Sequence, residues 1–343
     1  STSRMADHLA MLPSHPRDAT ALSRTSLSEI TERTTVLLRL EATTAYRPVD
    51  YLTSSPYFAE PHRGARVEWR SKMCEWKYRL VDACGLSRHA VMRSMNYLDR
   101  FMASAHFQAR EALADVRAYQ LAAMVCLYVS VKTFERVALH ADILAEISAG
   151  CYDAEEIMTM ERVILEALEW RLNGPTSREF ACCLLGLLDA GWYGRDRDIP
   201  LSLLEFGAFQ CELATGDYEL STACRPSEVA LAAVLHGIQG VDEGSMSVTS
   251  RCRYLKRVCV AMSRRIDMER VRYAQESLRE VLVRNGGLNL SHELRRRRGS
   301  RRRAASRSSR SGDCPESGRN ASLGVKTWSP SPVSVAGCPC PPA

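Results

Sequence analysis

Two charged side chains, Lys132 and Glu161, stand where the sequence predicts helices that are otherwise rich in apolar residues. Lys132 follows a nearly continuous apolar run, and Glu161 is surrounded by Ile157, Met160 and Ile164. Taken alone, each residue would simply solvate the end or edge of its helix, where charged side chains are usually found. A lysine and a carboxylate that lie side by side can also hydrogen-bond the backbone ends and side chains of a partner helix. The two residues are therefore candidates for binding another protein.

The sequence contains none of the short motifs that indicate catalysis or a bound cofactor. It has no Gly-x-Gly-x-x-Gly, Walker loop, Gly-x-Ser-x-Gly or His-Glu-x-x-His motif. Its eight histidines are scattered and no Cys-x-x-Cys pair occurs, so neither a metal site nor a cofactor is expected. We therefore expect a protein that is not an enzyme, with any catalysis belonging to a partner.

Four segments of the chain stand in an order and spacing that resemble the cyclin box. They are Arg70 to Trp76, Asn96 to Met102, Ser130 to Lys132, and Ile157 to Glu161 with its continuation from Trp170 to Thr176. The resemblance extends over roughly residues 66 to 285, which is the size of one compact domain with two sub-cores. It implies a double cyclin-box protein that binds and activates a cyclin-dependent protein kinase.

The resemblance also implies roles for individual residues. Lys132 and Glu161 match the lysine and glutamate with which cyclins grip the regulatory helix of the kinase. The accompanying kinase-binding positions are Thr133, Leu165, Trp170 and Leu172. Thr133 stands where the family usually has an aromatic residue, so we expect that contact to be weaker or altered. Arg70 and Asp99 match a buried ion pair that is structural, not catalytic.

A second surface implied by the resemblance is a substrate-docking patch, formed here by Trp69, Met73, Trp76 and Gln120. Tryptophan and methionine at helical spacing are more often core residues than ligand sites. The patch also carries Lys72 in place of an aliphatic residue and Arg79 in place of an acid. Because a basic Arg-x-Leu peptide would meet positive charge there, we expect it to bind weakly.

The hydrophobic pattern predicts an all-α fold. Residues 116–134 are apolar almost all round, as in a central buried helix, and no stretch alternates as a strand would. Capping-box patterns at Asp153 with Glu156 and at Thr176 with Glu179 predict the starts of two further helices. We expect two tandem five-helix cyclin-box repeats.

The predicted division of the chain has five parts. They are a disordered segment (1–27), an N-terminal helix and linker (28–65), a first cyclin box (66–174), a second cyclin box (175–285), and a basic, Ser/Pro-rich disordered tail (286–343).

Positive charge is concentrated in the tail. Residues 294–343 hold eleven Lys or Arg and two acidic residues, a net charge of +9, which leaves −3 for residues 1–293. The nearly neutral body makes nucleic-acid binding unexpected. The arginine runs 295–298 and 301–303 suit a nuclear-import receptor. No apolar run reaches the ~20 residues of a membrane-spanning helix, so we expect a protein of the nucleus or cytoplasm.

Two alternatives to a kinase-activating cyclin of the cell cycle stay open at this point. One is a transcription-type cyclin or a cyclin-fold adapter on DNA. The other is a helical scaffold that activates no kinase, which the altered docking patch favours. The sequence does not identify the kinase, the cell-cycle phase, the cyclin subtype or a degradation signal.

Overall fold

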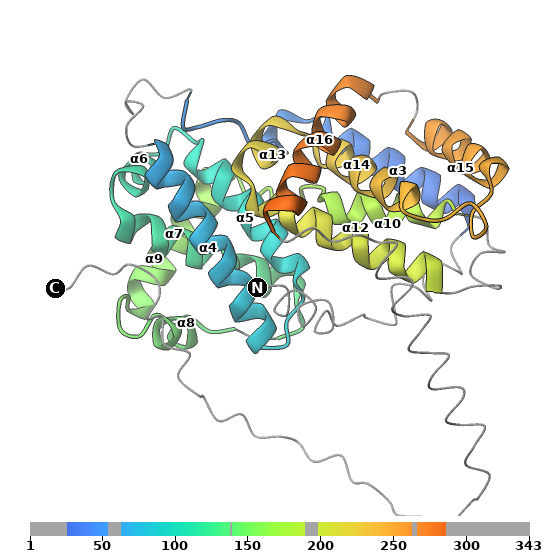
Figure 1. Ribbon diagram of the computed structural model, residues 1–343. Helices are drawn as coiled ribbons and strands as arrows, with labels where there is room; N and C mark the ends of the chain where they lie inside the picture. The colour runs from blue at the N-terminus through green and yellow to red at the C-terminus, as the bar shows by residue number, and fades with distance from the viewer. Residues whose placement is uncertain (1–25, 54–62, 138, 189–197, 263–265, 286–343) are drawn as a thin grey trace, which may run out of the picture.

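The computed structural model describes residues 26–53, 63–137, 139–188, 198–262 and 266–285, and these residues form helices and connecting loops without a strand (Figure 1). The predicted all-α fold is therefore confirmed. The arginine-rich tail and most of the predicted disordered N-terminal segment lie outside the described residues.

The first described helix, α3, spans Leu27–Glu41. Ser26 caps it, and Glu29 completes the capping box, so the helix begins one residue before the predicted start. Its buried apolar residues, Ile30 and Leu38, belong to the core of the C-terminal half of the molecule. A short 3₁₀ helix, Thr44–Tyr46, then leads into the linker.

The first helical group surrounds a central helix, α7. The group comprises α4 (Arg63–Ala83), α5 (His89–Met102), α6 (Phe107–Ala114), α7 (Val116–Phe134), α8 (Ala141–Ile147) and α9 (Ala154–Ala167). Every residue of α7 from Tyr119 to Val131 is buried, because α4, α5, α6 and α9 pack around it. The bounds of α7 coincide with the predicted 116–134. The short α6 was not predicted, so this group holds six described helices where five were expected.

The second helical group surrounds α14 in the same manner. It comprises α10 (Ser177–Gly186), α12 (Asp198–Gly216), α13 (Tyr218–Ala223), α14 (Pro226–Gln239), α15 (Val248–Ala261) and α16 (Met268–Arg284). Proline at the first position of α14 lacks only an N–H that a helix start leaves unpaired, and α10, α12 and α16 enclose the helix. The six-residue α13 was not predicted.

The two groups have separate hydrophobic cores that lie side by side (Figure 1). Met92 of α5 belongs to the core of the second group, and Tyr218 of α13 belongs to the core of the first. The predicted domain limits, with a division at residue 174, stay a prediction. In the structure α9 ends at Ala167 and α10 begins at Ser177, on either side of that residue.

No single helix in the described part of the chain has the length and hydropathy of a membrane span. The helices α6 and α7 meet both criteria only when taken together, and the pair bends by 120° between them. The same residues also hold no group of three or more His, Cys, Asp or Glu side chains arranged for a metal ion.

Candidate partner-binding site

The structure brings Lys132 and Glu161 into contact at one end of the first helical group. Lys132 lies in the last turn of α7, and its Nζ donates to the two carboxylate oxygens of Glu161 on α9 at 3.0 and 3.3 Å. The hydrogen bond to Glu161 raises the pKa of Lys132 despite partial burial. The lysine side chain is 51% exposed and the glutamate 14%. The pair is therefore formed before any partner arrives and remains open to solvent on the lysine side.

Local structure explains why these residues meet. Asp153 caps α9, and Glu156 closes the capping box, which fixes where the helix starts. Ile157 and Ile164 are fully buried, so they set the face that α9 turns toward the core. Lys132 lies at the carboxyl end of α7, where the helix dipole favours a positive charge.

The predicted apolar neighbours of the pair differ in exposure. Leu165 is buried, Leu172 is partly buried, and Trp170 is 68% exposed. Glu169 and Trp170 have φ angles of 52° and 59°, in the left-handed region that side chains other than glycine seldom occupy. The backbone N–H of Trp170 donates to the carbonyl of Leu165 at 2.9 Å, which closes this turn. A tight turn thus presents a large indole to solvent.

Thr133 is exposed, and its hydroxyl donates to the carbonyl of Val129 one turn back at 2.7 Å. The nearest aromatic residue in the chain is Phe134, which lies under the guanidinium of Arg93 at 4.0 Å from the ring centroid. Arg93 also pairs with Glu179 of α10 at 3.0 Å. Phe134 therefore packs at the first group's core beneath Arg93. The aromatic ring beside Lys132 is that of Tyr128, whose centroid lies 5.2 Å from the Lys132 Nζ.

One residue that the sequence reasoning omitted lies on the same face of α9. Met158 is 53% exposed and precedes Glu161 by three residues and Leu165 by seven. Such spacing places all three on one side of a helix. The periodicity alone could have identified Met158.

Arg70 and Asp99 form a second ion pair, in the interior. The Arg70 Nε and Nη2 atoms donate to the two oxygens of Asp99 at 2.8 Å each, and both side chains are at most 2% exposed. Burial alone lowers the pKa of Arg70, but the attraction of Asp99 and its hydrogen bonds outweigh that effect and leave the pKa raised. Arg70 therefore stays charged inside the protein.

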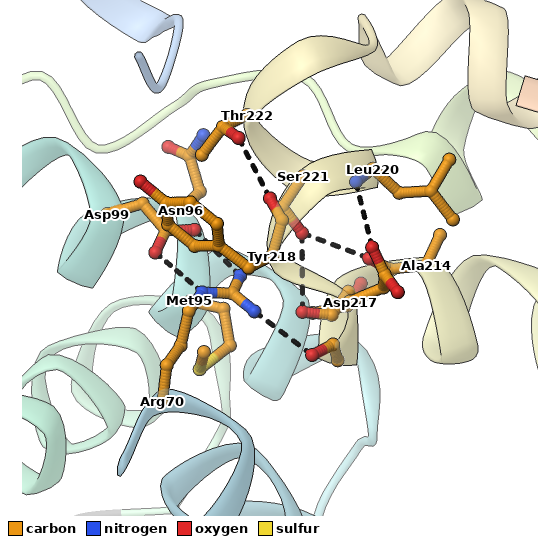
Figure 2. A network of polar contacts seen from close by, with 12 residues as sticks. Arg70, Met95, Asn96, Asp99, Ala214, Asp217, Tyr218, Leu220, Ser221 and Thr222 are labelled. Carbon is orange, nitrogen blue, oxygen red and sulfur yellow. Dashed lines mark hydrogen bonds and ion pairs between the residues drawn. The ribbon is translucent and has the colours of Figure 1, made fainter. Parts of the chain in front are cut away.

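Polar contacts around this buried pair join the two helical groups. Figure 2 shows Arg70 beside Asp99 and Tyr218, and its Nη1 donates to the carbonyl of Gly216 at the end of α12 at 3.2 Å. The linker takes part as well. Tyr51 donates to Asp99 at 3.2 Å, and Tyr218 donates to Asp50 at 2.8 Å. The buried pair is therefore part of the junction between the groups.

The residues of the predicted docking patch are mostly interior. Met73, Trp76 and Gln120 are buried, and Gln120 accepts a hydrogen bond from Tyr152 at 3.3 Å. Trp69 is only partly buried and packs against Tyr119. The expectation of excess positive charge at this patch also changes. Lys72 pairs with Glu68, one turn earlier on the helix, at 2.7 Å, and the sequence reasoning did not include this carboxylate. Peptide binding at this patch stays a prediction.

The known proteins that this chain resembles are cyclins. Residues 40–173 match the model of the cyclin N-terminal domain. The chain is 31% identical over 188 residues to G2/mitotic-specific cyclin-2 of Antirrhinum majus, which covers 55% of this chain and 38% of that protein. It is 30% identical over 112 residues to Cyclin-D3-3 of Arabidopsis thaliana, which covers 32% of this chain and 30% of that protein.

The matched region thus spans 38% and 30% of the length of these two curated relatives. Among solved structures, the X-ray structure of a viral cyclin from herpesvirus saimiri aligns with a TM-score of 0.41 and 18% identity, covering 57% of this chain and 85% of that one.

Proposed function

We propose, from the premise that this chain belongs to the cyclin family, that it is a regulatory subunit that binds and activates a cyclin-dependent Ser/Thr protein kinase. The names of its relatives, which include a mitosis-specific cyclin and a D3 cyclin, support a role in control of the cell cycle. In this role the chain donates no catalytic group. It orders the regulatory helix of the kinase, and the kinase performs phosphoryl transfer.

The observation that carries the proposal is the preformed, solvent-open pair of Lys132 and Glu161. An ammonium group has three N–H donors, and Glu161 engages only part of this capacity. Lys132 can therefore hydrogen-bond carbonyl or carboxylate oxygens of a partner helix while it remains paired. Glu161 keeps lone pairs for backbone or side-chain N–H donors of the same helix.

Apolar side chains beside the pair supply area to bury on binding. Met158 and Trp170 are exposed on the two sides of Glu161 along the chain, and Leu165 lies between them. Aromatic and methionine side chains are enriched at the centres of protein interfaces, where they contribute most of the binding energy. A charged pair flanked by such residues fits an amphipathic partner helix.

The test is capture of purified cyclin-dependent kinases by the immobilised chain, followed by a kinase assay on the bound material. We expect the Lys132→Ala, Glu161→Ala double variant to lose at least tenfold in captured kinase and in activity. The matched control is Arg117→Ala. This substitution removes another surface ion pair between α7 and α9, that of Arg117 with Glu156 at 3.4 Å near the amino-terminal ends of the two helices, and it leaves the capping box of α9 intact.

Each outcome of this assay distinguishes between functions. Full capture by the Lys132, Glu161 double variant would refute the assignment of the site. Capture without kinase activity would favour a cyclin-fold scaffold, and capture of a polymerase-tail kinase alone would favour a transcription-type cyclin.

A further inference from the structure

Helix α15 lies at the outer end of the second helical group, far from helices α7 and α9, which carry Lys132 and Glu161 (Figure 1). Only Tyr254, Val258 and Ala261 on this 14-residue helix are buried. Tyr254 donates to the carbonyl of Leu184 at 2.9 Å, and Arg257 donates to that of Leu187 at 3.1 Å. These contacts fix which face of α15 points inward, and they leave the remaining surface of the helix open.

The open face carries an apolar stripe, which we call the α15 stripe and define as Val248, Cys252, Leu255 and Cys259. Val248 is 59% exposed, Leu255 is 39% exposed, and both cysteines are exposed free thiols. The spacings of four, three and four residues place all four side chains on one side of the helix. The same spacing forms the seam of helices that pack as coiled coils.

Helix α15 itself carries charge of a single sign. Helix α15 contains Arg251, Arg253, Lys256 and Arg257 and no acidic residue. Arg251 and Lys256 flank the stripe on its two sides, and Arg251 donates to the carbonyl of Met246 at 3.1 Å, which satisfies a donor without neutralising its charge.

The neighbouring helix α16 differs from α15 in its surface charge. Its exposed face alternates Arg272 and Arg279 with Glu276 and Glu280. Mixed charge of this kind is what a solvent-exposed helix face ordinarily shows. The surface of α15 therefore differs from that of α16 in carrying basic residues and no acidic one.

We propose that the α15 stripe binds an acidic amphipathic helix of another protein, with apolar residues at heptad spacing and Asp or Glu at the flanking positions. This inference does not depend on the proposed kinase partner. An acidic partner complements Arg251 and Lys256 on the two sides of the stripe, whereas a second copy of α15 would bring like charges together. A lipid surface fits less well, because helices that lie in membranes present Trp, Phe and several Leu, and this stripe has one Leu and no aromatic residue.

The cysteines of the stripe provide a direct readout on the full-length chain. The probe is a synthetic helical peptide with Leu at the a and d positions and Glu at e and g. The peptide should slow alkylation of Cys252 and Cys259 by N-ethylmaleimide at least fivefold, as mapped by mass spectrometry. Cys84, an exposed thiol at the end of α4, is the internal control and should react at its original rate.

Two pairs of variants test the charge and the apolar contact separately. Lys256→Glu should weaken the peptide affinity at least tenfold, whereas Arg279→Glu on α16 should leave it within twofold. Leu255→Gln should have a similarly large effect, and its control is Val283→Gln, at an exposed apolar side chain of α16. Circular dichroism of each variant checks that the fold is retained.

Several results would overturn the proposal. These are unchanged alkylation of Cys252 and Cys259, equal binding of a control peptide with Lys in place of Glu, or equal sensitivity of the α15 and α16 variants. Binding of phosphatidylserine vesicles without binding of the peptide would identify a membrane surface instead. Strong peptide binding that appears only after deletion of residues 1–25 would assign the face to the chain's own N-terminal segment.

Discussion

The molecule contains two ion pairs of similar geometry in opposite environments. Arg70 and Asp99 are fully enclosed and make further hydrogen bonds to Tyr51 and Gly216. Lys132 and Glu161 meet at the surface with the lysine half exposed. Desolvation makes each buried charge depend on its partner, whereas water can replace either partner of an exposed pair. From this comparison we expect the first pair to stabilise the fold and the second to remain available for binding.

The largest expected effect is on the buried pair. Arg70→Ala or Asp99→Ala leaves an uncompensated charge in the interior and should reduce the free energy of unfolding by about 3–5 kcal/mol. Urea unfolding followed by circular dichroism measures this loss. Replacing both residues together, as Arg70→Met with Asp99→Leu, should be less harmful than either alanine substitution. If both single variants unfold at the wild-type urea concentration, the pair has no role in stability.

Lys77, a buried lysine without a carboxylate partner, extends the comparison of buried and exposed charges. Lys77 of α4 is fully buried, and its Nζ contacts the sulfur of Met95 at 3.3 Å. Burial lowers the pKa of Lys77 to about 8 from an ordinary value of 10.5. At pH 7 the folded protein must hold this charge without full hydration, which corresponds to a destabilisation on the order of 3 kcal/mol. Lys77→Met should therefore raise the free energy of unfolding at pH 7 by about 1–3 kcal/mol.

The pH dependence of this effect follows from the direction of the shift. Between pH 8 and 10.5 the unfolded chain binds the proton and the folded chain does not, so stability attributable to Lys77 rises with pH. The gain from Lys77→Met should accordingly be full below pH 8 and shrink toward pH 10.5. A gain of constant size across that range would show that charge burial is not its cause.

The effect on stability should be small at the exposed pair. Lys132→Ala or Glu161→Ala should change the free energy of unfolding by less than about 1 kcal/mol, because surface pairs contribute little. The same variants should lose about 2–5 kcal/mol of kinase-binding free energy, measured by isothermal titration. Comparable destabilisation of Lys132→Ala and Arg70→Ala would remove the distinction between the two pairs.

Deletion of the tail should have the smallest effect on the stability of the folded body. We propose that the arginine runs 295–298 and 301–303 bind a nuclear-import receptor. Deleting residues 295–343 should move a fluorescent fusion toward the cytoplasm and leave the unfolding midpoint and kinase capture unchanged. Undiminished nuclear accumulation would contradict the proposal.

Much of the fold was predictable because helix starts are encoded locally. The capping boxes at Asp153 and Thr176 are present as predicted, and α7 has the predicted bounds. The missed helices, α6 and α13, have eight and six residues, which is too short for a clear hydrophobic period.

The site was less accessible to sequence reasoning than the fold. The pairing of Lys132 with Glu161 and of Arg70 with Asp99 came from the family resemblance, since no local pattern brings residues 29 positions apart together. The contacts of Tyr51 and Tyr218 at the junction depend on tertiary packing and have no sequence signal. The burial of Lys77 was also missed, because a lysine in the amphipathic α4 is expected to face solvent.

The outward position of Trp170 gives the protein an intrinsic optical probe. An indole in water emits at longer wavelength than one in an apolar environment. Trp76 is already enclosed, while Trp170 is 68% exposed at the proposed binding site. Docking of a partner helix on Trp170 would shift its emission to shorter wavelength, and Trp170→Phe would remove that signal. Association at this surface can therefore be followed in real time without attaching a dye.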